Sequence, residues 1–416
     1  MKKIFTKHVQ LVVFSIVALL LLGFFVLPQV TAKTYTADEA SGQIDTSVAT
    51  ADPLDPSGTA LLADTSTATA VSTATHLPTP EPLYGIYMTS WVASTPSLRN
   101  NLIKLVDETS INAIVIDIKD YSGKIAYLTD DPTINMYGAA ESRIKGIEEI
   151  IADLHAKGVY VIGRVTVFQD PYLAKKFPDL AIKRVSDGGL WADKNGLHYL
   201  YPGNPDVWAY TAAIAKDAYA KGFDEINFDY VRFPSDGNIK DMAIPDSTLS
   251  KSEIVEEFFA YLDTELKDTG MKTSADLFGM TTTNTDDLGI GQVLEKALPY
   301  FDYVCPMVYP SHYPPNFNGW ANPNANPHDL IEYVMSAAVV RAEAMKNDPA
   351  QPESVRSRVN KDQLRPWLQN FSLGTPPYTS AEIRAQLDGT YDAGLTSWLL
   401  WDAANKYNYT RGALVE

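Results

Sequence analysis

The chain has 416 residues and a formal net charge of -17. This acidic balance leaves no basic stripe to neutralise phosphates, so it argues against a nucleic-acid partner and says nothing against neutral sugars. The single cysteine, Cys305, excludes an intrachain disulfide framework and a cysteine-based zinc site. Its apolar surroundings indicate a small buried side chain rather than a nucleophile.

Residues 1–32 are predicted to be a signal peptide or a membrane anchor. An apolar run from Leu11 to Leu27 follows three lysines and precedes the small residues Val30 and Ala32. The run is nearly long enough to span a bilayer, so a cleaved signal and an uncleaved anchor both remain open. The lysines favour a cytoplasmic N-terminus in either case. We therefore expect an extracytoplasmic protein, secreted or held at the membrane only through this segment.

Residues 33–82 are predicted to be a disordered linker. The stretch is rich in Ser, Thr, Ala and Pro, and Tyr35 is its only aromatic residue. Such a composition cannot bury enough apolar surface to offset the entropy of ordering.

Residues 83–416 are predicted to form one α/β domain, because apolar strand patterns alternate with amphipathic helical patterns. Strands are expected at 85–91, 112–120, 159–168, 224–233, 272–280, 302–310, 365–371 and 396–403. Helices are expected at 98–108, 144–157, 206–221, 252–268, 291–297, 328–345 and 380–393, and only 404–416 remain for an eighth.

This order of elements predicts a (β/α)8 TIM barrel with loop insertions. An open doubly wound sheet is the alternative, but no glycine-rich phosphate loop follows the first strand. The connection 169–205 is long for a barrel loop and contains several aromatic residues, so it is expected to be functional.

The stretch FDEINFDYVRFPSDG, residues 223–237, places Asp229 inside or at the C-terminal end of a buried strand. An ionised carboxylate there costs several kcal/mol unless it is paired or hydrogen-bonded. Asp229 is therefore either part of a structural ion pair, with Arg232 the nearby partner, or a reactive group kept ionised by Arg232 or Arg164 beside it.

Further polar and aromatic side chains occur near the ends of the other predicted strands, where barrels carry their function. Carboxylates and amides bind hydroxyl groups, and aromatic faces stack on sugar C–H surfaces, so we expect a sugar site. Asp276, on the next strand after Asp229, completes a carboxylate pair suited to glycosidic bonds. Asp117 and Asp120 can alternatively be structural partners of Lys119 or Arg164. The expected substrate contacts are Asp117, Lys119, Asp120, Arg164, Arg232, Tyr309, His312, Gln369, Trp401 and Asp402.

The motifs of several other hydrolases are absent from the sequence. It contains no H-E-x-x-H and no closely spaced histidine pair, and it contains no G-x-S-x-G. We therefore expect neither a catalytic metal nor another cofactor, although Asp286 and Asp287 can hold a structural Ca2+.

Several of these stretches together resemble a bacterial family of glycoside hydrolase-like domains, formerly classed as a domain of unknown function. The resemblance covers residues 84–405 and is carried by GIYMTSW, NAIVIDIKD, GRVTVFQDP, LYPGNPDVW and, most specifically, FDEINFDYVRFP. The family is similar to α-amylase-type barrel glycosidases.

That similarity implies that Asp229 is the nucleophile. The amylase type has a glutamate on strand five as acid/base, where this chain has Asp276. It also has an arginine two residues before the nucleophile, where this chain has Asn227, and Arg232 follows three residues after it. We therefore expect a glycoside hydrolase acting on an envelope or extracellular polysaccharide. The alternatives are a non-catalytic carbohydrate-binding barrel and a purely structural envelope protein, and the aromatic loop weighs against the latter.

Overall fold

The computed structural model describes residues 74–245 and 248–415. The predicted signal peptide or anchor, 1–32, and most of the predicted linker lie outside these residues. Within the described part of the chain, no helix combines the length and apolar character that a bilayer crossing needs.

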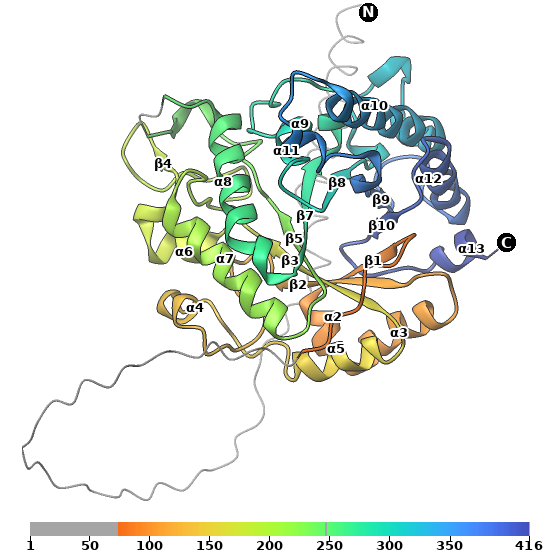
Figure 1. The fold of residues 1–416 in the computed structure, drawn as a ribbon, viewed down its shortest axis with the longest axis horizontal. Helices are drawn as coiled ribbons and strands as arrows, with labels where there is room; N and C mark the ends of the chain where they lie inside the picture. The colour runs from red at the N-terminus through yellow and green to blue at the C-terminus, as the bar shows by residue number, and fades with distance from the viewer. Residues whose placement is uncertain (1–73, 246–247, 416) are drawn as a thin grey trace, which may run out of the picture. The chain divides into compact units, whose positions relative to one another are not determined.

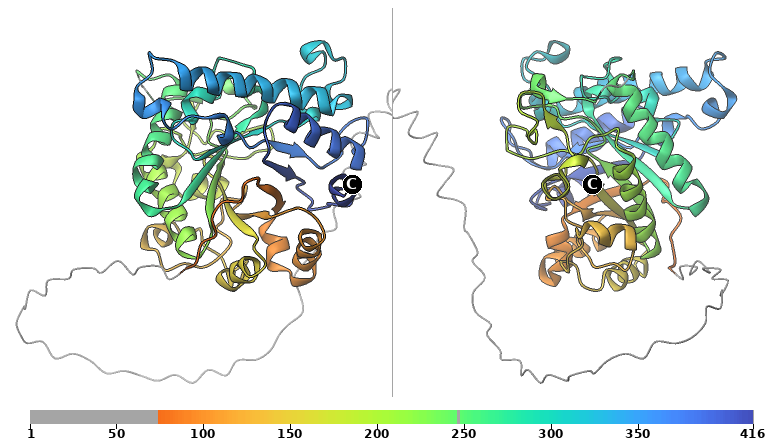
Figure 2. Two further views of the ribbon diagram at one scale, coloured as in Figure 1. Left: turned by 45° about the vertical axis from the view of Figure 1, so that its right-hand side comes forward. Right: turned by 90° about the vertical axis from the view of Figure 1, so that its left-hand side faces the viewer.

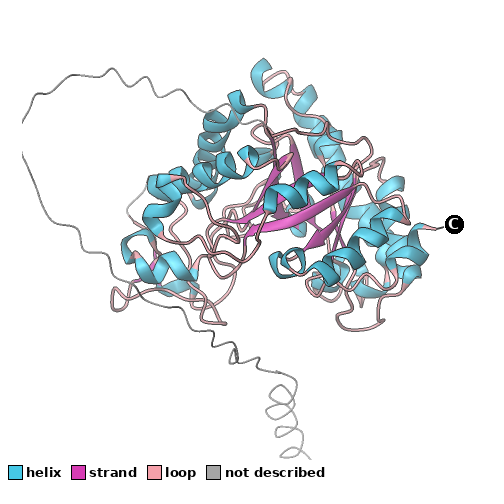
Figure 3. Ribbon diagram, turned by 90° about the horizontal axis from the view of Figure 1, so that it is seen from below, coloured by secondary structure: helices cyan, strands magenta, loops and turns pink. Residues whose placement is uncertain are grey.

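Parallel strands close into an eight-stranded barrel, which confirms the predicted fold (Figures 1 and 3). Their order around the barrel is β1-β10-β9-β8-β7-β5-β3-β2. The bounds are β1 Tyr84–Met88, β2 Ala113–Lys119, β3 Tyr160–Thr166, β5 Glu225–Asp229, β7 Lys272–Phe278, β8 Tyr303–Met307, β9 Trp367–Gln369 and β10 Trp398–Trp401. Each lies within or overlaps one predicted strand. β4 (Lys183–Arg184) and β6 (Met242–Ala243) form a separate antiparallel pair.

Helices surround the barrel, and α10 and α12 pack side by side along it (Figures 1 and 2). The helices between strands are α3 Pro96–Asp107, α5 Ile147–His155, α7 Pro205–Ala220, α8 Lys251–Leu266, α9 Leu294–Ala297, α10 Pro327–Asn347 and α12 Ser380–Asp392. The chain's last helix, α13 (Thr410–Leu414), is short, as expected. Shorter helices lie in the loops: α2 Ser90–Ser94, α4 Pro132–Tyr137, α6 Pro171–Lys176 and α11 Glu353–Arg356.

Side-chain alternation along the strands separates two buried regions. On β5, Ile226 and Phe228 join the large apolar core between sheet and helices, while Asn227 and Asp229 point to the other side, into the barrel. The barrel interior holds a smaller apolar cluster that includes Cys305. Burial raises the pKa of the Cys305 thiol well above its usual range, in keeping with the expected small buried side chain.

The folded domain begins before the predicted boundary at residue 83. The backbone N–H of Leu77 donates to Asp224 at 2.7 Å, and the Thr79 hydroxyl lies 3.1 Å from that of Tyr160. The boundary was therefore set too late, because residues 74–82 gain their order from the barrel rather than from a core of their own.

Candidate active site

Strand register brings the two predicted reacting carboxylates to the same end of neighbouring strands. Phe228 on β5 pairs with Ala275 on β7, so the next residues, Asp229 and Asp276, follow at one level. Both residues are at most 5% exposed. Since all strands of the barrel run parallel, this level is its C-terminal end, where barrel enzymes carry their chemistry.

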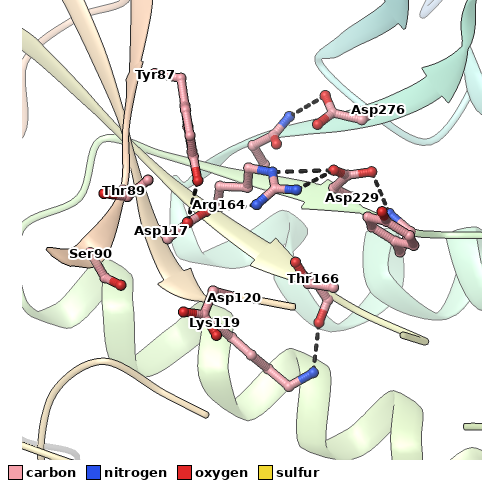
Figure 4. A network of polar contacts seen from close by, with 12 residues as sticks. Tyr87, Thr89, Ser90, Asp117, Lys119, Asp120, Arg164, Thr166, Asp229 and Asp276 are labelled. Atoms are coloured by element: carbon pink, nitrogen blue, oxygen red, sulfur yellow. Dashed lines mark hydrogen bonds and ion pairs between the residues drawn. The ribbon is translucent and has the colours of Figure 1, made fainter. Parts of the chain in front are cut away.

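Arg164 on β3 links two carboxylates in this layer (Figure 4). Its Nη1 donates to Asp117 at 2.6 Å, and its Nε donates to Asp229 Oδ2 at 3.2 Å. Its Nη2 also donates to Asp229 Oδ2. Burial lowers the pKa of Arg164, but the two carboxylates raise it more, so the guanidinium stays charged. Of the two arginines expected beside Asp229, Arg232 and Arg164, it is Arg164 on the neighbouring strand that pairs with it.

Asp276 is buried in a different setting. Asn227 donates to its Oδ1 at 2.9 Å, and the indole Nε1 of Trp367 donates to the same oxygen at 2.8 Å. Burial and the negative charge of Asp229 raise the pKa of Asp276 well above its usual range, against the opposing influence of Arg164. A raised pKa of this kind favours the protonated form of Asp276.

Asp229 is fixed by its own backbone as well. Tyr230, the next residue, has φ +54°, a conformation uncommon for a non-glycine residue. In it the Tyr230 N–H donates to Asp229 Oδ1 at 2.5 Å. The two carboxylate oxygens of Asp229 thus accept from different groups, Oδ1 from the backbone and Oδ2 from Arg164.

Two adjoining cavities open over this layer of residues. One, of about 400 Å³, contains Asp229 and Asp276 and is walled by apolar and aromatic side chains, among them Phe278, Met307 and Tyr309. The other, of about 410 Å³, contains Asp117 and reaches the long loop after β3. They share Arg164, Tyr230, Arg232 and Trp401 as common walls. Aromatic walls with a few converging polar groups are typical of ligand sites.

Most of the predicted substrate contacts line these cavities. Tyr309 and His312 line the first, Asp117 and Asp120 the second, and Arg164, Arg232 and Trp401 both. Asp117 is also paired with Arg164, one of the two structural partners expected as an alternative. Asp120 is paired with Arg143 instead of the expected Lys119 or Arg164.

Lys119, Gln369 and Asp402 do not line either cavity, because each is engaged inside the protein. The ammonium group of Lys119 is buried against Asp170 at 2.9 Å. The Gln369 side chain accepts from the Ser311 N–H and donates to the carbonyl of Phe371. Asp402 accepts from the Ala404 N–H at 2.8 Å.

Several residues of the site were not among the predicted contacts. Tyr87 donates to Asp117 Oδ2 at 2.5 Å, and the indole N–H of Trp367 donates to Asp276. Tyr230 was overlooked although it directly follows Asp229 in the most distinctive motif. The loop after β3 contributes Asp193, Asn195 and Tyr199 to the second cavity, in line with the expectation that 169–205 is functional.

Among the described residues, no cluster of three or more His, Cys, Asp or Glu side chains is arranged to hold a metal ion. Asp286 and Asp287 accept from the N–H groups of Leu288 and Gly289 in a turn.

Comparisons with known proteins show similarity in family and in fold. A family model described as "Putative glycosyl hydrolase domain" matches residues 85–407. A hypothetical protein from Ruminiclostridium thermocellum ATCC 27405 is 38% identical, covering 49% of this chain and 98% of its own, with a TM-score of 0.43. The PgaB (BpsB) glycoside hydrolase domain from Bordetella bronchiseptica is 15% identical, covering 80% and 99%, with a TM-score of 0.56, a likeness of fold. No curated protein matches the chain.

Proposed function

The chain belongs to the family described as "Putative glycosyl hydrolase domain", and we propose that it hydrolyses glycosidic bonds of an envelope or extracellular polysaccharide with Asp229 and Asp276. The observation that carries the proposal is the contrast between these two neighbouring carboxyl groups. Asp229 is held by the charged guanidinium of Arg164, whereas Asp276 has a raised pKa and keeps its proton.

The two environments suit the two roles in glycoside hydrolysis. Both N–H donors to Asp276 reach Oδ1, which leaves Oδ2 to carry the proton. Asp276 gives that proton to the glycosidic oxygen as the C–O bond breaks. Asp229 forms a bond to the anomeric carbon, and water later replaces it, losing its proton to Asp276. Arg164 and the Tyr230 N–H orient Asp229 for that attack.

The walls of the cavities support a sugar substrate. Trp401 lies between the two cavities, stacked on Tyr87 with ring centroids 4.0 Å apart. Aromatic faces of this kind pack against sugar C–H surfaces, and the surrounding carboxylates accept from hydroxyl groups.

The location is part of the proposal and rests on the sequence of residues 1–32. We assign the folded domain to the extracytoplasmic side, where a polysaccharide is within reach. Fusing the first 82 residues to a reporter that is active only outside the cytoplasm tests this assignment, and an inactive reporter contradicts it.

Incubation of the chain with a panel of bacterial and plant glycans, followed by measurement of new reducing ends, tests the activity. We expect cleavage of at least one glycan by the wild type and none by Asp229→Asn. Binding without cleavage would instead favour a non-catalytic carbohydrate-binding barrel.

A further inference from the structure

A further hollow, of about 700 Å³, lies outside the active-site cavities, between α10, the loop after β8 and the turn after β7. Its apolar part consists of Trp320, Tyr333 and Val340, which we call the Trp320 surface. Tyr333 is 44% exposed and Val340 67% exposed. Exposed apolar side chains gathered in one hollow mark an interaction site more often than scattered ones do.

A row of aromatic rings joins the Trp320 surface to the catalytic cavity. Tyr313 lines that cavity, and its ring centroid is 4.7 Å from that of Phe317. Phe317 in turn lies 6.4 Å from Trp320 and 6.1 Å from Tyr333. The backbone follows the same course, because Gly279 lines the catalytic cavity and Thr282 lines the hollow.

Phe317 is the ring between the others, and both Phe317 and Trp320 are partly buried against the core. Trp320 and Tyr333 meet edge to face at 85°, with centroids 6.1 Å apart, and both line the hollow. Two rings at this angle present an apolar corner to a ligand.

The polar groups around the hollow favour a ligand rich in hydroxyl groups over an anion. Asp329 and Glu332 lie at its border, and the Asp329 side chain is 64% exposed. The cation among the lining residues, Arg341, is held by Glu295 and by the carbonyls of Thr281 and Asn284. Carboxylates accept from hydroxyl groups and repel anionic ligands.

We infer that the Trp320 surface is a second saccharide-binding site for a polysaccharide chain that also occupies the catalytic cavity. The inference rests on the proposed function and specifies its substrate as a long polymer. A polysaccharide bound at one site is held close to the other site, which raises its effective concentration there. Long polymers that reach both sites therefore bind more tightly, and short fragments that reach only one site do not.

Hydrolysis kinetics with two substrate lengths test the inference. We compare the wild type with Trp320→Ala/Tyr333→Ala on the polymer that it cleaves and on a fragment of two or three units from the same polymer. We expect KM for the polymer to rise about tenfold or more, with kcat/KM for the fragment unchanged. Tyr409→Ala, at another exposed aromatic residue (52% exposed), serves as the control and should behave as the wild type. An unchanged KM for the polymer in the double variant would overturn the inference.

A binding measurement separates this inference from the proposed function. Affinity electrophoresis of full-length Asp229→Asn in gels containing glycol chitin, laminarin, xylan or carboxymethyl cellulose needs no hydrolysis. We expect retardation by one of the first three polymers, and its loss when Trp320→Ala/Tyr333→Ala is added, whereas the anionic carboxymethyl cellulose should not retard either protein. Equal retardation of both proteins, or retardation of neither by any of the first three polymers, would overturn the inference.

Two further measurements address misfolding of the double variant and dimerisation through the Trp320 surface. Val340→Glu charges the hollow at an exposed position without removing a packed ring, and it should weaken binding in the same way if the double variant fails to fold. The molar mass in solution is measured in parallel. If the wild type is a dimer and the double variant a monomer, a second copy of the chain occupies the surface and the inference fails.

Discussion

Arg164 donates to Asp229 through two N–H groups that reach the same oxygen, Oδ2, while its third donor reaches Asp117. A planar guanidinium presents its N–H donors in a rigid fork, which lets it hold two carboxylates at once in a fixed geometry. Arg164 thereby pairs with two buried carboxyl groups and leaves the face of Asp229 toward the cavity open for reaction.

We expect Asp229→Asn to lower turnover by roughly three orders of magnitude or more, since it removes the proposed nucleophile. The fold should survive, because Arg164 keeps Asp117 and the new amide oxygen can still accept from it. Steady-state kinetics and thermal unfolding measure the two effects. Asp286→Asn, at an exposed loop carboxylate, should match the wild type. Substantial activity in Asp229→Asn would rule out the glycosidase assignment of this residue.

The effect of Asp276→Asn should depend on the leaving group. Natural glycans need a proton at the departing oxygen, so their hydrolysis should fall strongly. Activated aryl glycosides leave without it, so their first step should be nearly unaffected. The rates of the wild type and Asp276→Asn on both substrate types measure this difference. If Asp276→Asn cleaves a natural glycan at the wild-type rate, the acid lies elsewhere, and Asp120 becomes the next candidate because it lines a cavity.

The raised pKa of Asp276 also predicts how stability varies with pH. A carboxyl group with a higher pKa in the folded state binds its proton more tightly there. Stability therefore falls as pH rises from the unfolded-state pKa near 3.8 toward the folded-state pKa. Asp276→Asn removes this dependence, so its stability relative to the wild type should increase with pH across that window, by at most about 1.4 kcal/mol per pH unit. Denaturant unfolding of both proteins at several pH values measures this difference in stability. A difference that stays constant across the window would contradict the raised pKa of Asp276.

Residues 74–82 should add stability to the barrel. A chain that begins at residue 83 loses the stacking of His76 on Tyr219, with centroids 3.9 Å apart, and the hydrogen bond from Leu77 to Asp224. We expect it to remain soluble but to melt about 2 °C or more below a chain that begins at residue 74. A chain that begins at residue 60 is the control and should melt at the same temperature as the chain that begins at residue 74. Equal melting of all three would show that the contacts contribute nothing.

Activity is expected to survive chelation. The proposed reaction uses two carboxyl groups and an arginine, and no described cluster of side chains is arranged to hold a metal ion. Rates measured before and after treatment with EDTA should agree. Loss of activity that Ca2+ restores would contradict this expectation and direct attention to the turn at Asp286 and Asp287.

The barrel was predictable because its signals are local. Each strand of the barrel coincides with an apolar run, and helix ends carry their own signals, such as Gly158 with φ +74° after α5 and the capping box of Ser250 and Glu253 before α8. The position of Asp229 and Asp276 on consecutive barrel strands also followed from the sequence, since parallel strands end at one edge.

The sequence did not predict which side chains form ion pairs and hydrogen bonds inside the barrel. These pairings depend on the register between strands and on side chains that cross the interior. Arg232 is near Asp229 in sequence, yet Arg164 binds it from the neighbouring strand. Lys119 follows Asp117 on the same strand, yet its ammonium group reaches Asp170 after β3. Trp367 reads as a core residue, yet its indole N–H crosses from β9 to Asp276 on β7.

The sequence by itself determined the alternation of strands and helices, the closed barrel and the pair of carboxyl groups at its C-terminal end, because each follows from local apolar periodicity and from the geometry of parallel strands. Only the tertiary structure decided which carboxyl group is paired with an arginine and which has a raised pKa. That difference depends on burial and on the distance to Arg164, and both are set by chain segments far apart in sequence.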